Sequence, residues 1–374
     1  LSLHDALPIW SADHVQVSLR FVPTKLRTGM TPSPLSSSDP RPPDFIGIGA
    51  AKAGTAWLWK RLQHSPETSL PPQKELHYFD RSLDYPSSNW LADAHPLRRL
   101  FGSEPHNERY RRLAWRRIYA AARRRDGAAL RWYIRYYLGH CDDDWYLSLF
   151  DLPEANKKLT GEITPAYALL STDDVKWVHT LAPNAKILLL LRNPIERAYS
   201  HYHYHLFTGK AATPSSFSEV IRDEENVFRN KIIRLGRYDR QILRFDEHFS
   251  RDQMKIILQE DLREETESVV RDVCRFVGVD STFAPSPETH NTTRNPVLPG
   301  LYYWVRRAWQ PVKSIGESIF PKGIDVFRQG ARHLLTTRER PEMAVEDRMY
   351  LRRVYEDTIS WTEQRLGLAL PHWK

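Results

Sequence analysis

The stretch Asp44–His64, which reads DFIGIGAAKAGTAWLWKRLQH, constrains the fold of this chain more than any other. Its apolar run Phe45–Ile48 is typical of a short buried strand, and a turn of small residues, Gly49–Gly54, follows it. Thr55–His64 then has the pattern of a helix, which the dipeptide Ser65–Pro66 ends. A strand, a tight turn and a helix in this order predict one βα unit of an α/β protein.

The turn in this unit has the features of an anion site. Backbone N–H groups at a helix start lack intrahelical partners and lie at the positive end of the helix dipole. Lys52 adds a mobile positive charge, but it precedes Gly54, whereas a nucleotide-triphosphate loop has its lysine after the last glycine. Ala56 offers no hydroxyl for a magnesium ion. The turn therefore predicts phosphate or sulfate binding without an obligatory metal, and an ordinary glycine-rich turn is the alternative.

A second strand and helix start are predicted within Lys186–Phe207, KILLLLRNPIERAYSHYHYHLF. Ile187–Leu191 is a continuous apolar run, as expected for a parallel strand that is covered on both faces. Asn193 is placed to cap the next helix, with Pro194 as its first residue and Glu196 as the partner of a capping box.

Two residues of this second segment suit phosphate binding. Arg192 directly follows the predicted strand, at the edge where open α/β sheets bind ligands. Ser200 shares one helix face with Arg197 and Tyr204. A guanidinium fork and a nearby hydroxyl match phosphate oxygens. The alternative, in which Arg192 pairs with a carboxylate and Ser200 is a surface residue, is less favoured once both segments are considered.

Four segments in the same order resemble the motifs of sulfotransferases. Lys52–Leu58, KAGTAWL, resembles the loop that binds the donor's 5′-phosphosulfate, and Arg192–Tyr202 resembles the motif for its 3′-phosphate. Lys74–Asp80, KELHYFD, and Gly161–Tyr167, GEITPAY, resemble the branch that includes heparan-sulfate sulfotransferases and bacterial relatives. The donor of such enzymes is 3′-phosphoadenosine 5′-phosphosulfate (PAPS). Each motif is weak alone, but four in family order are specific.

The resemblance implies a P-loop-like three-layer α/β fold, in which helices flank a central, mainly parallel sheet. It implies PAPS as co-substrate and no metal. Arg192, Ser200 and, in the loop His290–Pro296, Arg294 are the expected contacts of the 3′-phosphate end. The expected contacts of the phosphosulfate end are Lys52, Ala53, Gly54, Thr55, Ala56 and Trp57.

The resemblance also assigns catalytic roles. Glu75 matches the proposed general base of the glycan-modifying branch, and Lys52 is placed to stabilise the leaving phosphate. His77 is the competing base, and Asp80 has a supporting role. The alternative is that Glu75 is a surface carboxylate paired with its neighbouring lysine. Ile163 stands where some glycan sulfotransferases have a lysine, which weakens a transfer of function to heparan sulfate itself.

The composition limits which ligands and which cellular locations are expected. The formal net charge of +8 favours an anionic ligand, although nucleic acid is not expected. No apolar run is long enough to span a membrane. Cys141 and Cys274 are too few for a disulfide framework, so we expect buried thiols and a cytoplasmic location. Because the sequence does not begin with methionine, a membrane-associated or Golgi-type location stays open.

The chain divides into regions of different character. Residues 1–43 read as disordered, and residues 1–9 resemble a translated sequencing adapter. Residues 44–374 form the expected sulfotransferase domain. Within it, 107–137 is a helical insertion rich in arginine and aromatic residues, with an aromatic core side or, alternatively, an acceptor cleft. Residues 297–345 are expected to form a basic helical lid or subdomain that could contact a membrane surface.

The sequence does not identify the acceptor. A carbohydrate, a glycolipid and a small hydroxylated molecule all fit, and Tyr167 is either an acceptor-site wall or a core residue. Two other function classes compete with the sulfotransferase: a kinase-like phosphotransferase and a non-catalytic polyanion-binding protein. The first would need a lysine after Gly54, and the second predicts salt-sensitive binding to any polyanion.

Overall fold

The computed structural model describes residues 41–153, 158–208, 215–264, 266–279, 295–296, 336–337 and 341–373. The predicted disorder of residues 1–43 falls outside these residues, except at 41–43. The predicted lid, 297–345, also lies outside them, except at 336–337 and 341–345.

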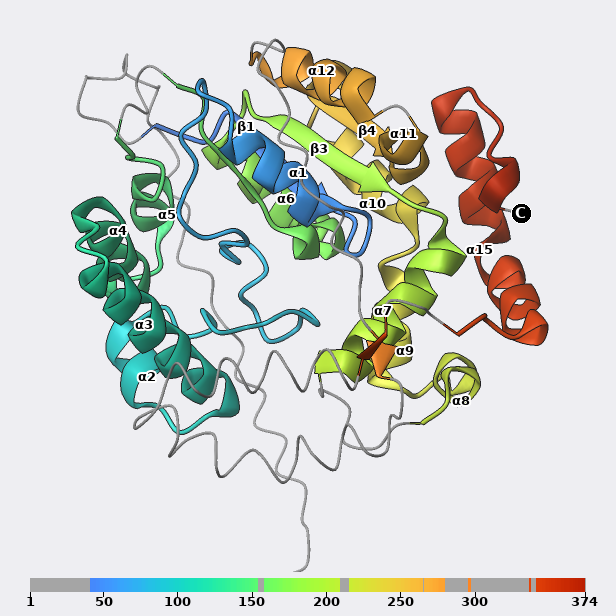
Figure 1. The fold of residues 1–374 in the computed structure, drawn as a ribbon, viewed down its shortest axis with the longest axis horizontal. Helices are drawn as coiled ribbons and strands as arrows, with labels where there is room; N and C mark the ends of the chain where they lie inside the picture. Colours follow the sequence, from blue (N-terminus) through green and yellow to red (C-terminus); the bar gives the residue numbers. More distant parts are fainter. Residues whose placement is uncertain are drawn as a thin grey trace, which may run out of the picture. The chain divides into compact units, whose positions relative to one another are not determined.

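A sheet of four parallel strands forms the centre of the fold, in the order β2-β1-β3-β4 (Figure 1). Its strands are β1 (Phe45–Gly49), β2 (Gly161–Ile163), β3 (Lys186–Leu191) and β4 (Met254–Leu258). In β1, Phe45 pairs with the first residue of β2 on one side and of β3 on the other. The two strands predicted from apolar runs are confirmed, because each run is long enough to be buried on both faces.

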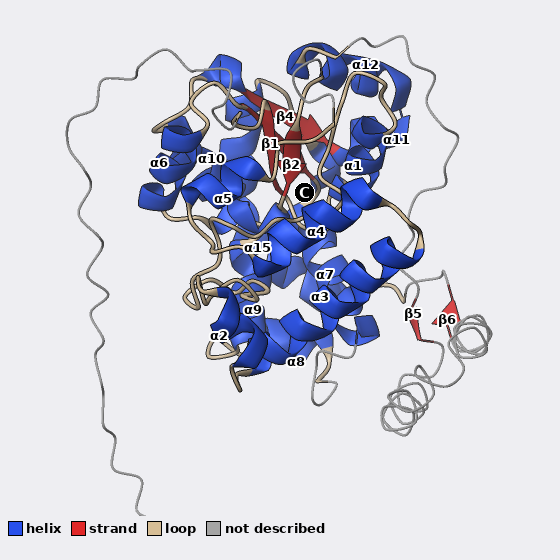
Figure 2. Cartoon of the chain, turned by 90° about the vertical axis from the view of Figure 1, so that its left-hand side faces the viewer, coloured by secondary structure: helices blue, strands red, loops and turns tan. Residues whose placement is uncertain are grey.

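Helices cover both faces of the sheet (Figure 2). On one face lie α1 (Thr55–Gln63) and α12 (Thr266–Val277), and on the other lie α6 (Thr172–Leu181) and α10 (Tyr238–Asp246). This is the three-layer α/β architecture predicted from the sequence.

The remaining elements connect these layers or surround them. They are α2 (Pro96–Phe101), α3 (Pro105–Arg123), α4 (Gly127–Leu138), α5 (Asp143–Ser148), α7 (Pro194–Thr208), α8 (Phe217–Arg222), α9 (Val227–Arg234), α11 (Gln259–Glu264), α15 (Val345–Leu366), the 3-10 turns η1 (Pro165–Leu169), η2 (Arg251–Gln253) and η3 (Pro371–Trp373), and the antiparallel pair β5 (Asn295–Pro296) and β6 (Thr336–Thr337).

The start of α7 corrects one local prediction. Asn193 caps the helix as expected, because its Oδ1 accepts the N–H of Ile195 at 2.9 Å. The capping box is not closed by Glu196, which instead forms an ion pair with Arg348 at 2.6 Å. The backbone N–H of Asn193 donates to Oε1 of Glu260 at 3.1 Å. A tertiary partner therefore satisfies the donor that the local pattern assigned to Glu196.

The arginine-rich insertion forms the helices α3 and α4, and the aromatic side of α4 is packed inside. The buried aromatic residues of α4 are Trp132, Tyr133, Tyr136 and Tyr137. The guanidinium of Arg99, which is fully buried, donates to the backbone carbonyls of Asp93 and Ala94 at 3.1 and 3.0 Å. Cys141 and Cys274 are also buried, as predicted.

Candidate active site

The carboxyl ends of all four central strands line one cavity of about 1640 Å³. Lys52 follows β1, Pro165 follows β2, Arg192 follows β3 and Gln259 follows β4. Parallel strands end at one edge of the sheet, and β1 has neighbours on both sides there. This is the switch point at which α/β sheets bind ligands.

Most of the predicted loop residues reach this cavity. Lys52, Gly54, Thr55, Ala56 and Trp57 line it, and Gly54 caps α1 with a φ of 104°, which glycine adopts without strain. Lys52 Nζ lies 2.9 Å from the centroid of the Tyr204 ring.

Two of the predicted loop residues are placed differently from the others. Ala53 is fully buried in the hydrophobic core and does not line the cavity. The N–H of Trp57 donates to the carbonyl of Gly54 at 2.9 Å, so this donor is already engaged by the first turn of the helix. Lys52 and the first residues of α1, Thr55 and Ala56, remain the part of the loop that is predicted to hold an anion.

The second predicted segment forms the adjacent wall. Arg192 and Ser200 both line the cavity, and Arg192 Nη1 donates to the backbone carbonyl of Lys52 at 3.2 Å. This bond joins two segments that lie 140 residues apart in sequence. Arg197, predicted on the same helix face as Ser200, is fully buried and donates to the carbonyl of Ile232 instead.

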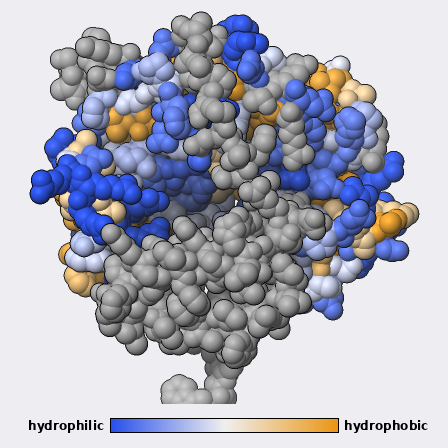
Figure 3. Space-filling view, in the orientation of Figure 1, coloured by the Kyte–Doolittle hydropathy of each residue, from blue (hydrophilic) through white to orange (hydrophobic). Residues whose placement is uncertain are grey.

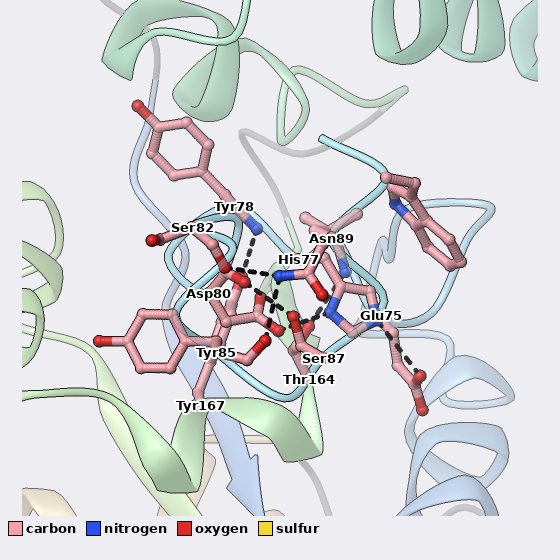
Figure 4. A network of polar contacts seen from close by, with 12 residues as sticks. Glu75, His77, Tyr78, Asp80, Ser82, Tyr85, Ser87, Asn89, Thr164 and Tyr167 are labelled. Atoms are coloured by element: carbon pink, nitrogen blue, oxygen red, sulfur yellow. Dashed lines mark hydrogen bonds and ion pairs between the residues drawn. The ribbon is translucent and has the colours of Figure 1, made fainter. Parts of the chain in front are cut away.

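The segment that carries Glu75 and His77 is irregular and has an unusual backbone. Both residues adopt the left-handed conformation, with φ of 68° and 57°. The intervening Leu76 N–H donates to Thr164 Oγ1 at 3.0 Å, and the Tyr78 N–H donates to the Tyr167 hydroxyl at 3.0 Å (Figure 4). Side chains from the turn after β2 therefore hold a conformation that these residues do not favour alone.

The hydroxyls of Thr164 and Tyr167 both donate hydrogen bonds to Glu162, which is fully buried. Glu162 accepts from Thr164 at 2.6 Å, from Tyr167 at 3.1 Å and from Tyr146 at 2.7 Å. Burial raises the pKa of Glu162 to about 7, although the three hydroxyl donors oppose that rise. Of the two interpretations of Tyr167, core packing is correct.

Glu75, His77 and Asp80 form one charged cluster, with the His77 ring between the two carboxylates (Figure 4). His77 Nδ1 donates to Asp80 Oδ2 at 2.8 Å, and its Nε2 lies 3.6 Å from Glu75 Oε2. Burial alone would lower the pKa of His77, but Asp80 and Glu75 raise it to about 10. His77 is therefore an imidazolium at neutral pH.

Glu75 is a carboxylate under the same conditions. Burial alone would raise its pKa, but Lys74, at 2.7 Å from Oε1, and His77 hold it well below the ordinary value. The side chain of Glu75 is 40% exposed and lines the cavity, whereas Asp80 is fully buried and does not. The ion pair with Lys74 that the surface interpretation expected exists, but it lies on the cavity wall.

Several cavity residues could not be identified from the sequence. The guanidinium of Arg109 in α3 lies 5.2 Å from the Trp90 ring, and Trp90 meets the His77 ring edge-on at 5.0 Å. Burial lowers the pKa of Arg109. His201 and Lys231 line the cavity beside Ser200. The arginine-rich composition of α3 was the only signal for Arg109, and nothing distinguished it from the arginines around it.

Other predictions concern absent features or residues outside the described part. Arg294 falls outside the described residues. Ile163 is fully buried, against the bare Cα of Gly47, and does not line the cavity. Among the described residues, no cluster of His, Cys, Asp and Glu is arranged to hold a metal ion. Within the same part of the chain, no helix combines the length and apolarity needed to cross a bilayer.

Curated relatives match part of this chain. It is 26% identical over 253 residues to the bifunctional heparan sulfate N-deacetylase/N-sulfotransferase 1 of Xenopus laevis, covering 64% of this chain and 26% of the relative. It is 27% identical over 200 residues to the membrane-associated sulfotransferase kil1 of Dictyostelium discoideum, covering 52% and 31%. The matches thus span between about a quarter and a third of these relatives.

A solved structure shares the fold, and a family model identifies the domain. The sulfotransferase of Alicyclobacillus acidocaldarius is similar in fold, with a TM-score of 0.56 and 24% identity over 88% of this chain and 98% of that one. The family model described as the sulfotransferase domain matches residues 42–297, well over half of the chain. The chain therefore belongs to the sulfotransferase family.

Proposed function

We propose that the cavity binds PAPS and that the protein transfers its sulfuryl group to a hydroxyl or amine of a carbohydrate-containing acceptor. One observation carries this proposal. Arg192 donates to the carbonyl of Lys52, so that two segments suited to phosphate binding form one continuous wall. A donor with a phosphosulfate at one end and a separate phosphate at the other needs two such sites at a fixed separation.

The residues of this wall fit the charge of such a donor. Lys52 and the N–H groups of Thr55 and Ala56 would hold the phosphosulfate end. Arg192 and Ser200 would hold the 3′-phosphate end. When bound, the donor supplies an activated sulfuryl group. The ammonium of Lys52 is placed to stabilise charge on the phosphate that departs.

Glu75 is the group best suited to accept the acceptor's proton. It is an exposed carboxylate on the cavity wall, whereas His77 already carries a proton that Asp80 and Glu75 stabilise. His77 therefore serves to orient Glu75 rather than to act as the base. The low pKa of Glu75 keeps it deprotonated across the physiological range, and binding an acceptor that displaces Lys74 would make it more basic.

Arg109 supports an acceptor that carries an acidic group. Arg109 lies with Lys74 on the wall that holds Glu75. The names of the N-sulfotransferase relatives include heparan sulfate, an acidic carbohydrate. We expect Arg109→Ala to raise KM about tenfold for carboxylated or sulfated sugars, because a charge-assisted hydrogen bond is lost. Neutral acceptors should be unaffected. Arg131→Ala, which alters an exposed arginine of α4, is the control, and an equal effect on both acceptor classes would remove Arg109 from this role.

Thermal stabilisation by nucleotides tests the donor site. We expect 3′,5′-adenosine bisphosphate to raise the melting temperature, since ligand at 100-fold its Kd adds about 2.7 kcal/mol. ATP with magnesium should add much less. Stabilisation by ATP with magnesium alone would favour a kinase-like protein, and equal stabilisation by any polyanion would favour a binding protein. A donor-dependent mass-shift screen over sugars, glycolipids and small alcohols would then identify the acceptor class.

A further inference from the structure

One face of helices α2 and α3 exposes large apolar side chains among arginines. We call it the α2–α3 face and define it by Leu97, Phe101, Arg112, Trp115, Arg116 and Tyr119. The exposed fractions of the apolar members are 56% for Leu97, 80% for Phe101, 75% for Trp115 and 58% for Tyr119. Arg112 and Arg116 are exposed as well.

These residues lie on two helices that pack against each other. On α3, positions 112, 115, 116 and 119 share one side of the helix, which also carries the exposed Glu108 one turn before Arg112, so arginines outnumber carboxylates there by two to one. Arg111 joins this helix to the end of α2, because its Nη1 donates to the carbonyls of Leu100 at 3.3 Å and Gly102 at 2.6 Å. Phe101 therefore lies beside the turn of α3 that precedes Trp115.

Packing within the domain does not explain this face. The core side of α3 is a different one, formed by Tyr110, Ala114 and Ala121, which are buried. Figure 3 shows strongly hydrophilic residues next to apolar ones over the α3–α4 region, at the left of the view. None of the ion pairs found among the described residues involves Arg112 or Arg116. Several large apolar side chains that are exposed together on adjacent helices mark an interaction surface.

We propose that the α2–α3 face docks on the surface of a membrane that contains anionic lipids. Tryptophan, tyrosine and phenylalanine side chains insert at the level of lipid headgroups, while arginines pair with lipid phosphates. A soluble acidic polymer would use Arg112 and Arg116 but would leave Leu97 and Phe101 exposed. A second copy of the chain would bring like charges together across a two-fold axis, which disfavours self-association.

The face has a direct structural connection to the cavity. Arg109, which lines the cavity, lies one helical turn before Arg112 on α3. Docking would therefore hold one wall of the cavity near the lipid headgroups. Resting on the proposed function, this places the carbohydrate of a lipid-linked acceptor within reach of Glu75.

Vesicle sedimentation tests the docking without donor or acceptor, so its result is independent of the proposed function. The full chain is mixed with vesicles of phosphatidylcholine, or of equal parts phosphatidylcholine and phosphatidylglycerol. We expect it to bind only the anionic vesicles. Phe101→Ala with Trp115→Ala should weaken binding at least about tenfold, from the lost apolar burial. Arg112→Ala with Arg116→Ala should weaken it roughly thirtyfold at low salt.

Matched variants elsewhere on the chain serve as controls. Val227→Ala with Leu243→Ala removes two exposed apolar side chains, and Arg352→Ala with Arg353→Ala removes two exposed arginines of α15. Neither pair should change binding, and the melting temperatures of all variants should match the wild type. The proposal is overturned if the wild type fails to bind anionic vesicles, binds neutral ones equally, or binds unchanged after both face substitutions.

Two further results would assign the face to another partner and also overturn the proposal. One is binding to soluble polyglutamate that needs the two arginines but tolerates loss of Phe101 and Trp115. The other is a dimer in sedimentation velocity that the face substitutions convert to a monomer.

Discussion

The two walls of the cavity are built in different ways. The wall that holds Lys52 and Arg192 consists of turns at the ends of adjacent parallel strands, and one hydrogen bond joins them. The wall that holds Glu75 and His77 is irregular, and both residues have positive φ. Its conformation depends on Thr164 and Tyr167, which belong to another part of the chain.

This difference indicates how each wall responds to change. A strand end and a helix start are local structures, so the backbone of the first wall follows largely from its own two segments. On the irregular wall, the position of the Glu75 carboxylate depends on buried hydrogen bonds to Glu162. A substitution of that distant side chain can therefore shift Glu75. We therefore expect substitutions on the first wall to change donor affinity and substitutions behind the second wall to change turnover.

The largest effect is expected for Glu75→Gln. Loss of a general base lowers kcat by about 100- to 10,000-fold, because the acceptor keeps its proton. Binding of 3′,5′-adenosine bisphosphate should be unchanged, since the donor wall is separate. Turnover and calorimetric binding would be compared with Glu104→Gln, an exposed carboxylate at the start of α3. Near-normal turnover would exclude Glu75 as the base.

A smaller effect, on donor binding rather than on turnover, is expected for Arg192→Ala. Removal of a charge-assisted hydrogen bond should weaken binding of 3′,5′-adenosine bisphosphate about 10- to 100-fold. Arg192→Lys should restore little, because an ammonium cannot bond both a phosphate and the carbonyl of Lys52 with a planar fork. Arg240→Ala, at an exposed position of α10, is the control. An unchanged Kd would mean that the two segments do not share one ligand.

The smallest effect is expected for Glu162→Gln, and it has a pH signature. The pKa of Glu162 is raised from 4.5 to about 7 in the folded state, so its favourable contribution at low pH is lost as pH rises through about 7. The glutamine does not titrate. The melting temperature of the variant, relative to wild type, should therefore rise between about pH 5 and pH 8.

Turnover of the same variant reports on positioning. The amide of glutamine has only one acceptor oxygen, so one hydroxyl that supports the Glu75 segment loses its partner. We expect kcat to fall about tenfold with donor binding unchanged. A melting-temperature difference between variant and wild type that does not change with pH, together with a normal kcat, would show that Glu162 has no influence on the second wall.

The backbone of the first wall was predictable from local sequence patterns. The resemblance pointed to Glu75 and His77 on the second wall, but their conformation was not predictable. Phe45–Ile48 and Ile187–Leu191 have the period and length of buried strands, and Asn193 is a strong cap, so these elements follow from local rules. The partner of the cap, Glu260, follows no local rule, because it lies 67 residues away. In the sequence nothing distinguishes Arg109 from the arginines around it, and only the packing of α3 places it beside Trp90.

The sequence by itself determined the βα units, the turn with Lys52 and the order of the motifs, because hydrophobic period, turn residues and helix caps act between near neighbours. Only the tertiary structure decided that His77 is charged, that Tyr167 belongs to the core and that Glu162 supports the Glu75 segment. A pKa depends on burial and on charges that approach in space, and a positive φ in Glu75 persists only where distant groups stabilise it. Both conditions arise only when the chain has packed.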